Sequence, residues 1–242
     1  MNAIEIKGLT KKYKDVTAVD NLTLDVKEGE LLSLLGVNGA GKTTTVKMLA
    51  CLTSPTSGDA TVLGKSIVNE SALIKPHIAH SPQQTAIASG LTVLENLELI
   101  AGIHGFSKER RAAKIKELSE LLGLSEVISR RAGKLSGGWQ RRLSIAMALI
   151  SDPEILFLDE PTLGLDVLAR SDLWDIIRAL RGKTTVILTT HYMEEAESLS
   201  DRVAVMKSGK LIALDTPEGL KARAGTESFE QAFIKVVKEA EK

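Results

Sequence analysis

Residues 31–49 read LLSLLGVNGAGKTTTVKML, and this stretch decides the fold class. Its apolar start, Leu31–Leu35, predicts a buried strand, and Thr44–Leu49 predicts a helix. Residues 36–43 between them match the phosphate-binding loop pattern G-x-x-x-x-G-K-[ST]. At the average glycine usage of about 7%, three glycines at these places arise in roughly 3 of 10,000 windows, which argues against a simple glycine-rich turn.

The loop predicts which groups hold the phosphates. Glycines let successive backbone N–H groups turn inward around a phosphate, and the helix N-terminus adds its dipole. Lys42 supplies a charge near the β- and γ-phosphates, and the Thr43 hydroxyl is a candidate ligand for Mg²⁺. The residues expected to bind the nucleotide are Gly36, Asn38, Gly39, Ala40, Gly41, Lys42, Thr43 and Thr44.

Two adjacent carboxylates, Asp159 and Glu160, end the apolar run Ile155–Leu158. In an open parallel sheet the carboxyl ends of the strands form the ligand crevice. Asp159 is placed to reach the Mg²⁺ shell, and Glu160 to polarise a water for in-line attack on the γ-phosphate. Alone, this pair is typical of a solvated loop; together with the phosphate loop it predicts a hydrolytic site.

A second glycine-rich helix start lies at Ser136, Gly137 and Gly138, ahead of a predicted helix that runs through Ile145 and Leu149. Backbone donors and a helix dipole again face outward toward an anion. The chain therefore has two predicted phosphate-binding features about a hundred residues apart.

Apolar runs alternate with helix-like stretches, which is typical of a mainly parallel sheet. These runs are Leu31–Leu35, Ile155–Leu158, Thr185–Leu188 and Val203–Met206. A small antiparallel sheet is expected beside it, from Ile4–Ile6, Leu22–Val26 and Thr61–Leu63 after a Ser-Gly-Asp turn. The expected fold class is α/β, a P-loop NTPase.

A helical subdomain is expected at about 86–150, where apolar residues take helical spacing and strand signals disappear. We expect one ATPase domain over 1–220 with this subdomain inserted in it. Residues 221–242 are expected to form a helical tail on the same domain, with Ser228 and Gln231 spaced as a capping box. Contact of this tail with a partner is the alternative.

The combination of phosphate loop, Leu-Ser-Gly-Gly turn and Asp-Glu strand resembles the ATP-binding subunit of ABC transporters over nearly the whole chain. The resemblance implies roles for further residues: Tyr13 stacking on adenine, Gln83 in catalysis and as a Mg²⁺ ligand, Asp166 in the Gly-Leu-Asp loop, and His191 as the switch histidine. It also implies that Ser136 and Gly138 contact the nucleotide of a second ATPase subunit, head to tail. That second subunit is either an identical or a different chain.

Three positions depart from the commonest family pattern. Trp139 stands in place of a glutamine, Leu163 in place of a small polar residue, and Gln84 where an acidic residue often follows. Trp139 leaves the glycine backbone intact, so nucleotide contact is expected to survive. Leu163 is expected to affect communication between the two sites.

The resemblance implies an ATP hydrolase that powers transport, with the exporter branch the nearest pattern, through a separate membrane-spanning permease. A soluble ABC-type switch acting on DNA or ribosomes is the alternative, although the long coiled coil or fused halves of that class are missing from the sequence. A phosphotransferase would leave the Ser-Gly-Gly turn and His191 without a role. The expected location is the cytoplasmic face of the cell membrane, held there by the permease.

Composition agrees with these expectations. Lys+Arg and Asp+Glu both number 31, so no overall field favours nucleic acid. A basic group flanks the Ser-Gly-Gly turn but has no interleaved aromatics, so nucleic acid is not an expected partner. The only cysteine, Cys51, is expected within a helix as a packing residue. No apolar run approaches the ~20 residues that span a bilayer, so a membrane location requires a partner.

Overall fold

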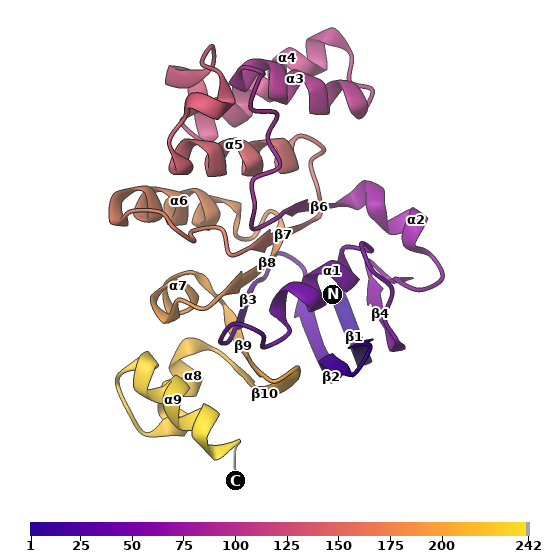
Figure 1. Cartoon of the computed structure of the whole chain (residues 1–242), viewed down its shortest axis with the longest axis vertical. Coiled ribbons are helices and arrows are strands. Elements are labelled where there is room, and N and C mark those ends of the chain that lie inside the picture. Colours follow the sequence, from indigo (N-terminus) through magenta and orange to yellow (C-terminus); the bar gives the residue numbers. More distant parts are fainter. Residues whose placement is uncertain (241–242) are drawn as a thin grey trace.

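The structure is a computed structural model, and it describes residues 1–240. Its centre is a six-stranded sheet in the order β10-β9-β3-β8-β7-β6, which runs down the middle of Figure 1. The pairs from β9 through β6 are parallel, and β10 joins β9 antiparallel. The strands are β3 (Leu31–Leu35), β6 (Ile78–Ser81), β7 (Ile155–Asp159), β8 (Thr185–Thr190), β9 (Arg202–Lys207) and β10 (Lys210–Asp215).

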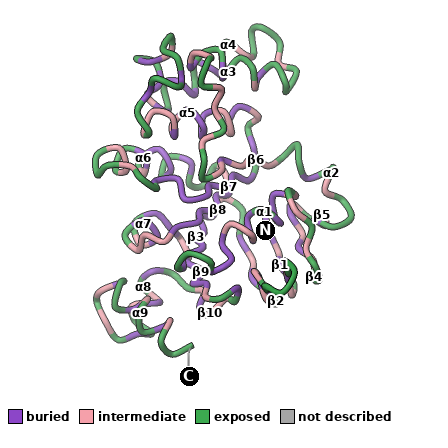
Figure 2. The backbone as a smooth tube through the Cα atoms, in the orientation of Figure 1, coloured by how far each residue is buried: buried purple, intermediate pink, exposed green. Residues whose placement is uncertain are grey.

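The central strands are buried on both faces, which explains their continuous apolar sequence. Because alternate side chains of a strand point to opposite faces, Leu156 and Leu158 pack with one layer while Ile155 and Phe157 pack with the other. Figure 2 shows this burial concentrated along the sheet and the helix faces turned to it. The sheet therefore fixes where its carboxyl ends lie.

One face is covered by the second sheet and by α1 (Lys42–Leu49). That sheet has the order β2-β1-β4-β5 and is antiparallel throughout. Its strands are β1 (Asn2–Tyr13), β2 (Val16–Lys27), β4 (Ser57–Val62) and β5 (Lys65–Ser66), and the short helical turns α2 (Ser71–Ile74) and η1 (Lys75–His77) lead on to β6.

Helices cover the other face of the central sheet, and those within residues 93–149 lie at the upper part of Figure 1. They are α3 (Val93–Ile103), α4 (Lys108–Leu121), α5 (Gly137–Leu149), α6 (Val167–Leu180) and α7 (Met193–Leu199), with short turns η2 (Leu124–Val127) and η3 (Ala132–Lys134). Thr92 starts α3 with a full capping box to Glu95. The predicted α/β class is confirmed: a largely parallel sheet, an antiparallel sheet and a helical portion. Among residues 1–240, no helix combines the length and apolar character needed to cross a bilayer.

Two local predictions are wrong, and two strands are missing from the predicted set. The strand expected at Thr61–Leu63 begins at Ser57, so the Ser-Gly-Asp sequence lies within β4, and Leu63 is in the turn after it. Cys51 is beyond the end of α1, at a positive φ of 55°, because the helix ends before it. Strands β6 and β10 were not predicted at all.

The C-terminal segment forms two helices rather than one, α8 (Pro217–Ala224) and α9 (Phe229–Glu239). Phe229 and Val236 bury α9 against β9, β10 and α8. Ser228 accepts from the Gln231 amide as predicted, but the Gln231 side chain bonds Thr226 instead of closing the capping box. The proposed division at residue 220 falls within α8, and residues 241 and 242 of the predicted tail lie outside the described residues.

Candidate functional site

The candidate site is a cavity of about 730 Å³ where β3, β7 and β8 end beside the start of α1. Predicted residues from distant parts of the sequence meet in its wall. They are Asn38, Gly39, Ala40, Gly41, Lys42, Thr43, Thr44, Gln83, Glu160 and His191. The sheet topology explains the meeting, because the carboxyl ends of parallel strands share one edge.

The backbone of the phosphate loop requires glycine at two places. Gly41 has a φ of 100°, and a Cβ there would lie 2.4 Å from the Ala18 carbonyl oxygen. At Gly36 a Cβ would lie 2.3 Å from the Met206 carbonyl oxygen. The loop is thus packed directly against β9 and the β1–β2 hairpin, and α1 begins without a side-chain cap.

Lys42 lies under the loop with a side chain only 4% exposed. Its Nζ donates to the carbonyl oxygens of Gly36 (2.7 Å) and Val37 (3.2 Å) and lies 3.8 Å from Glu160 Oε1. Burial lowers the pKa of the Lys42 ammonium, and the charges of Glu160 and Asp159 oppose that shift. The ammonium is held in place beside the cavity, with partners already fixed by the loop.

Asp159 and Thr43 form a pair of oxygen groups at the end of β7. Thr43 Oγ1 donates to Asp159 Oδ1 at 2.9 Å, and Thr189 Oγ1 donates to the same oxygen at 2.5 Å. Asp159 is 2% exposed, so these hydroxyls stabilise its charge. Thr189, which sequence reasoning missed, orients the carboxylate from the neighbouring strand β8.

Glu160 receives two side chains, one at each carboxylate oxygen. Gln83 Nε2 donates to Oε2 at 3.2 Å, and His191 Nδ1 lies 3.3 Å from Oε1. The Glu160 backbone is in the left-handed region, with a φ of 44°, and its N–H donates to Thr189. Such strain persists only where neighbours hold it, and it is common at functional sites. The three predicted catalytic residues are therefore in contact, although Gln83 faces Glu160 rather than Asp159.

The Ser-Gly-Gly turn lies outside this cavity. Ser136 is the N-cap of α5 and makes no side-chain capping bond, and Ser136 and Gly137 are exposed. Asp166 is the N-cap of α6, where its carboxylate accepts from the Ala169 N–H at 2.9 Å. A Cβ on Gly138 would lie 3.2 Å from the Ala169 Cβ, so the turn sits against the start of α6.

Tyr13 is also absent from the cavity wall. It ends β1, is 46% exposed, and has Lys11 Nζ at 5.0 Å from its ring centroid. Val16, its partner across the β1–β2 turn, does line the cavity. The stacking role of Tyr13 stays a prediction, as do the nucleotide contacts of Ser136, Gly137, Gly138 and Asp166.

Sequence reasoning also missed cavity residues at the β1–β2 hairpin (Val16, Thr17 and Ala18) and Ser208. It treated Arg141 only as part of the basic group that flanks the Ser-Gly-Gly turn. Arg141 is only 4% exposed. Helical spacing gave a usable signal for it, since Gly138, Arg141 and Ile145 fall on one face of α5. The hairpin residues belong to no sequence motif, and only the fold of the chain places them at the cavity.

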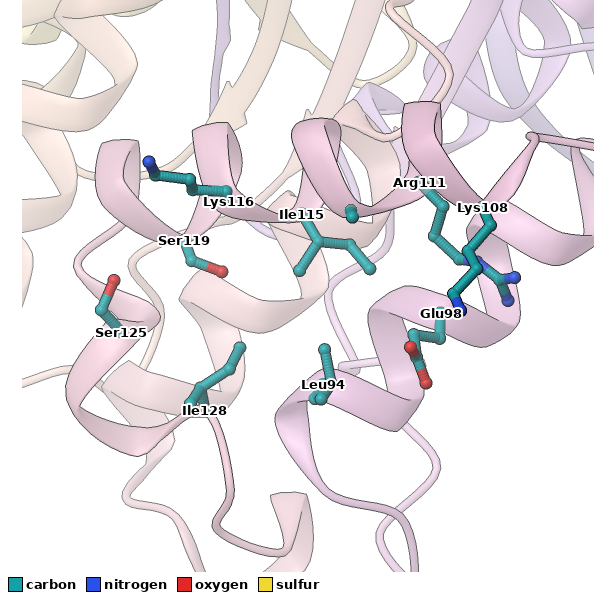
Figure 3. A pocket seen from close by; sticks show the side chains of 10 residues that line it. Leu94, Glu98, Lys108, Arg111, Ile115, Lys116, Ser119, Ser125 and Ile128 are labelled. Atoms are coloured by element: carbon teal, nitrogen blue, oxygen red, sulfur yellow. The ribbon is translucent and has the colours of Figure 1, made fainter.

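A second hollow, about 420 Å³, lies on the helical portion between α3, α4 and η2 (Figure 3). Leu94, Ile115 and Ile128 form its apolar middle, with Glu98, Lys108 and Arg111 at one end. Ser119 is 5% exposed, points into the hollow, and its hydroxyl has no partner among the described residues. This surface is distant from the phosphate loop and has a different chemistry.

The fold and cavity define an ATP-binding domain of the phosphate-loop class. The family model described as "ABC transporter" matches residues 19–163. The chain is 41% identical to the Probable multidrug ABC transporter ATP-binding protein YbhF of Escherichia coli (strain K12), over 99% of the chain and 42% of YbhF. It is 43% identical to the Daunorubicin/doxorubicin resistance ATP-binding protein DrrA of Streptomyces peucetius, over 93% of the chain and 68% of DrrA.

Among solved structures, the dimeric ATP-binding cassette MJ0796, bound to ADP and Pi, matches with a TM-score of 0.79 at 29% identity, over 88% of this chain and 98% of that one. The chain belongs to the ABC transporter family, as an ATP-binding protein of that family, so the family resemblance and the fold are confirmed. The chain spans less than half the length of YbhF and about two thirds of DrrA.

Proposed function

We propose that this chain hydrolyses ATP as one of two ATPase subunits and thereby powers export through a separate membrane-spanning partner. The observation that carries the proposal is that Lys42 and Glu160 line one cavity, with Gln83 and His191 on the glutamate, while Asp159 accepts a hydrogen bond from the cavity residue Thr43. Each group has a distinct part in phosphoryl transfer to water.

The chain's own residues support the following mechanism. Lys42 and the loop N–H groups hold the β- and γ-phosphates, and the negative charge of the phosphates offsets the burial of the ammonium. Glu160 accepts a proton from the attacking water, and Gln83 and His191 fix the orientation of its two oxygens. His191 then supplies a hydrogen-bond donor near the γ-phosphate, where negative charge develops.

Thr43 and Asp159 fit a magnesium site. Mg²⁺ prefers oxygen ligands and is usually held by one or two carboxylates together with substrate phosphates. Within residues 1–240, no group of three His, Cys, Asp or Glu side chains could hold a metal ion, so the substrate would complete the coordination. When bound, Mg²⁺ neutralises charge on the β- and γ-phosphates. Gln83 is a third candidate ligand if it leaves Glu160.

A second subunit is proposed because the Ser-Gly-Gly turn has no phosphate partner within its own chain. Placed head to tail, two copies would bring each turn to the other copy's phosphate loop, and Asp166 would lie at the same contact. The dimeric cassette MJ0796 supports this arrangement by its likeness. Light scattering of the purified Glu160→Gln chain with ATP tells whether the second subunit can be an identical chain, because a homodimer has twice the mass of the chain.

The membrane partner is proposed to dock at the hollow between α3 and α4. Its apolar middle suits apolar side chains, the Ser119 hydroxyl offers an unused hydrogen bond, and Lys108, Arg111 and Lys116 outnumber Glu98. The docking segment is therefore expected to be amphipathic and acidic. This partner would hold the chain at the cytoplasmic face of the membrane. The multidrug transporter name of YbhF and the drug-resistance name of DrrA favour an export role.

The test is purification of the tagged chain from detergent-solubilised native membranes, followed by mass spectrometry. A stoichiometric polytopic membrane protein is expected, and it should be lost from an Ile115→Glu, Arg111→Glu variant that still hydrolyses ATP. An Arg178→Glu variant, at an exposed position of α6, serves as the matched control. Recovery of ribosomes or DNA-repair proteins instead would favour the soluble switch.

A further inference from the structure

Arg141 is a buried cation at the junction of three segments. It lies on α5, one helical turn after the Ser-Gly-Gly turn, and is 4% exposed. No carboxylate forms an ion pair with it among the described residues, although Asp159, Glu195 and Glu160 are near enough to act on its charge. Burial lowers the pKa of this guanidinium, and those three carboxylates oppose the shift. A buried charge without a direct ion pair requires other strong partners.

Those partners are all backbone carbonyls. The Nε group donates to Pro161 O at 2.7 Å, and Nη1 donates to Pro82 O at 2.5 Å. The Nη2 group donates to the carbonyl oxygens of Glu160 (2.7 Å), Gln83 (3.2 Å) and Asp159 (3.2 Å). The guanidinium therefore ties α5 to the segment before Gln83 and to the turn after β7.

These carbonyls belong to the residues whose side chains form the hydrolytic site. Gln83 and Glu160 contact each other through their side chains, and Arg141 holds both of their backbones. Glu160 is in the left-handed conformation, which points consecutive carbonyls of residues 159–161 at Arg141. Without the guanidinium, these buried carbonyls would lose their donor, and the strained turn would lose a restraint.

We propose that Arg141 is a positioning residue that couples the Ser-Gly-Gly end of α5 to the placement of Glu160 and Gln83. The inference rests on the proposed ATP hydrolysis. When a nucleotide of the second subunit seats against the start of α5, the helix moves as a unit, and Arg141 transmits that movement to the two side chains in its own chain's cavity. Binding at one site then sets the geometry of hydrolysis at the other.

The chemistry explains why arginine is required. Its planar guanidinium presents five N–H donors in a fixed fork, whereas a lysine ammonium offers three donors at one point. A lysine at 141 would keep the charge but could not reach Pro161, Pro82 and Glu160 together. Charge alone is therefore insufficient for the coupling.

The test compares Arg141→Lys and Arg141→Met with a control at the next residue. Arg142 bonds the Leu122 carbonyl and Asp172 on the helical side and contacts none of the catalytic residues. Steady-state hydrolysis and ATP affinity are measured for each full-length folded variant.

Both Arg141 variants should lose at least about tenfold in kcat, because small misplacements of reacting groups are costly. The ATP dissociation constant of the free chain should stay within about twofold, since the phosphate loop is untouched. Arg142→Lys should match the wild-type chain in both.

A second measurement separates positioning from mere stability. In the Glu160→Gln background, ATP-dependent dimerisation of the Arg141→Lys chain should weaken at least about tenfold, while the melting temperature stays high enough for the chain to remain folded. Wild-type kcat in folded Arg141→Lys and Arg141→Met would overturn the inference. Lack of ATP hydrolysis by the wild-type chain would instead refute the proposed function, so the two failures are distinguishable.

Discussion

The molecule has two glycine-rich helix starts, and they differ in what surrounds them. The start of α1 carries Lys42 and Thr43 into a cavity shared with Glu160, and Thr43 donates a hydrogen bond to Asp159. The start of α5 presents Ser136 and Gly137 to solvent, and neither residue lines the cavity at the phosphate loop. Both offer backbone donors and a helix dipole to an anion. We therefore propose that the first is the catalytic half of a site, and that the second is a binding surface that needs a phosphate from another chain.

The largest expected effect is the loss of kcat when Glu160, the proposed base beside the start of α1, is replaced. Glu160→Gln removes the base while keeping the size of the side chain, so kcat should fall about 10²–10⁴-fold with ATP affinity retained. ATP should then trap a dimer, visible as a doubled mass in light scattering. Glu154→Gln, at the opposite end of β7 and exposed, is the matched control. Unchanged steady-state hydrolysis in Glu160→Gln would remove the assigned base.

Lys42→Ala tests how much the start of α1 contributes to ATP affinity. It deletes a buried ammonium aimed at the phosphates, and a charge-assisted hydrogen bond of about 1.5–3 kcal/mol corresponds to a loss of roughly 10–150-fold in ATP affinity. Equilibrium binding of a fluorescent ATP analogue measures it. Lys47→Ala, on the exposed side of the same helix, should bind like the wild type. Equal losses at Lys42 and Lys47 would contradict the assignment.

Gly138→Asp sharpens the comparison at the other helix start. A carboxylate there should repel a phosphate approaching from a second chain but favour α5 through its dipole, so folding should survive. ATP binding by the single chain should be unchanged within about twofold, while ATP-dependent dimerisation should fall about tenfold or more. Gly102→Asp places the same charge in open space on α3. A parallel loss of ATP affinity in the single chain would argue that both helix starts serve one chain.

His191→Ala tests whether His191 orients the Glu160 carboxylate for hydrolysis. Because His191 contacts Oε1 of the glutamate, its loss should lower kcat by about tenfold and leave ATP affinity unchanged. His104→Ala, exposed at the end of α3, is the control. Wild-type turnover in His191→Ala would exclude the switch role.

The smallest effect concerns the thermal stability of the chain and the buried carboxyl of Glu195. Burial raises the pKa of this carboxyl, opposed by hydrogen bonds from Thr190, Thr162 and Trp174. The protonated Glu195 carboxyl therefore adds to the free energy of unfolding. This contribution is fully present below the unfolded-state pKa and is lost as pH rises through the folded-state pKa. Glu195→Gln stays neutral, so its melting temperature should exceed that of the wild type by about 2–4 °C at pH 8, and the gap should shrink toward pH 5. A pH-independent gap in calorimetry would refute this.

The local sequence was sufficient to predict those site residues that are neighbours in the chain. Residues 36–43 and the Asp159-Glu160 pair were identified because their pattern and their flanking apolar strands lie side by side in the chain. Gln83 and His191 came only from the family resemblance, since a lone glutamine or histidine has no pattern of its own. Their contact with Glu160 depends on the order of β6, β7 and β8 in the sheet.

The failures have a common physical cause, namely dependence on tertiary neighbours. Strands β6 and β10 are the sheet edges, short or half-exposed, and their pairing is set by β7 and β9. Arg141 looks like a surface charge until the carbonyls of residues 82, 83 and 159–161 fold around it. Cys51 leaves the helix because the chain turns there into the segment leading to β4.

The central claim is that one hydrolytic site needs the α1 start of one chain and the α5 start of another. The direct test mixes two inactive variants, Lys42→Ala and Gly138→Asp, and measures ATP hydrolysis. A mixed dimer contains one complete site, formed by the phosphate loop of the Gly138→Asp chain and the turn of the Lys42→Ala chain. The mixture should hydrolyse ATP well above the sum of the two separate rates. A mixture that forms dimers yet hydrolyses no faster than that sum would contradict it.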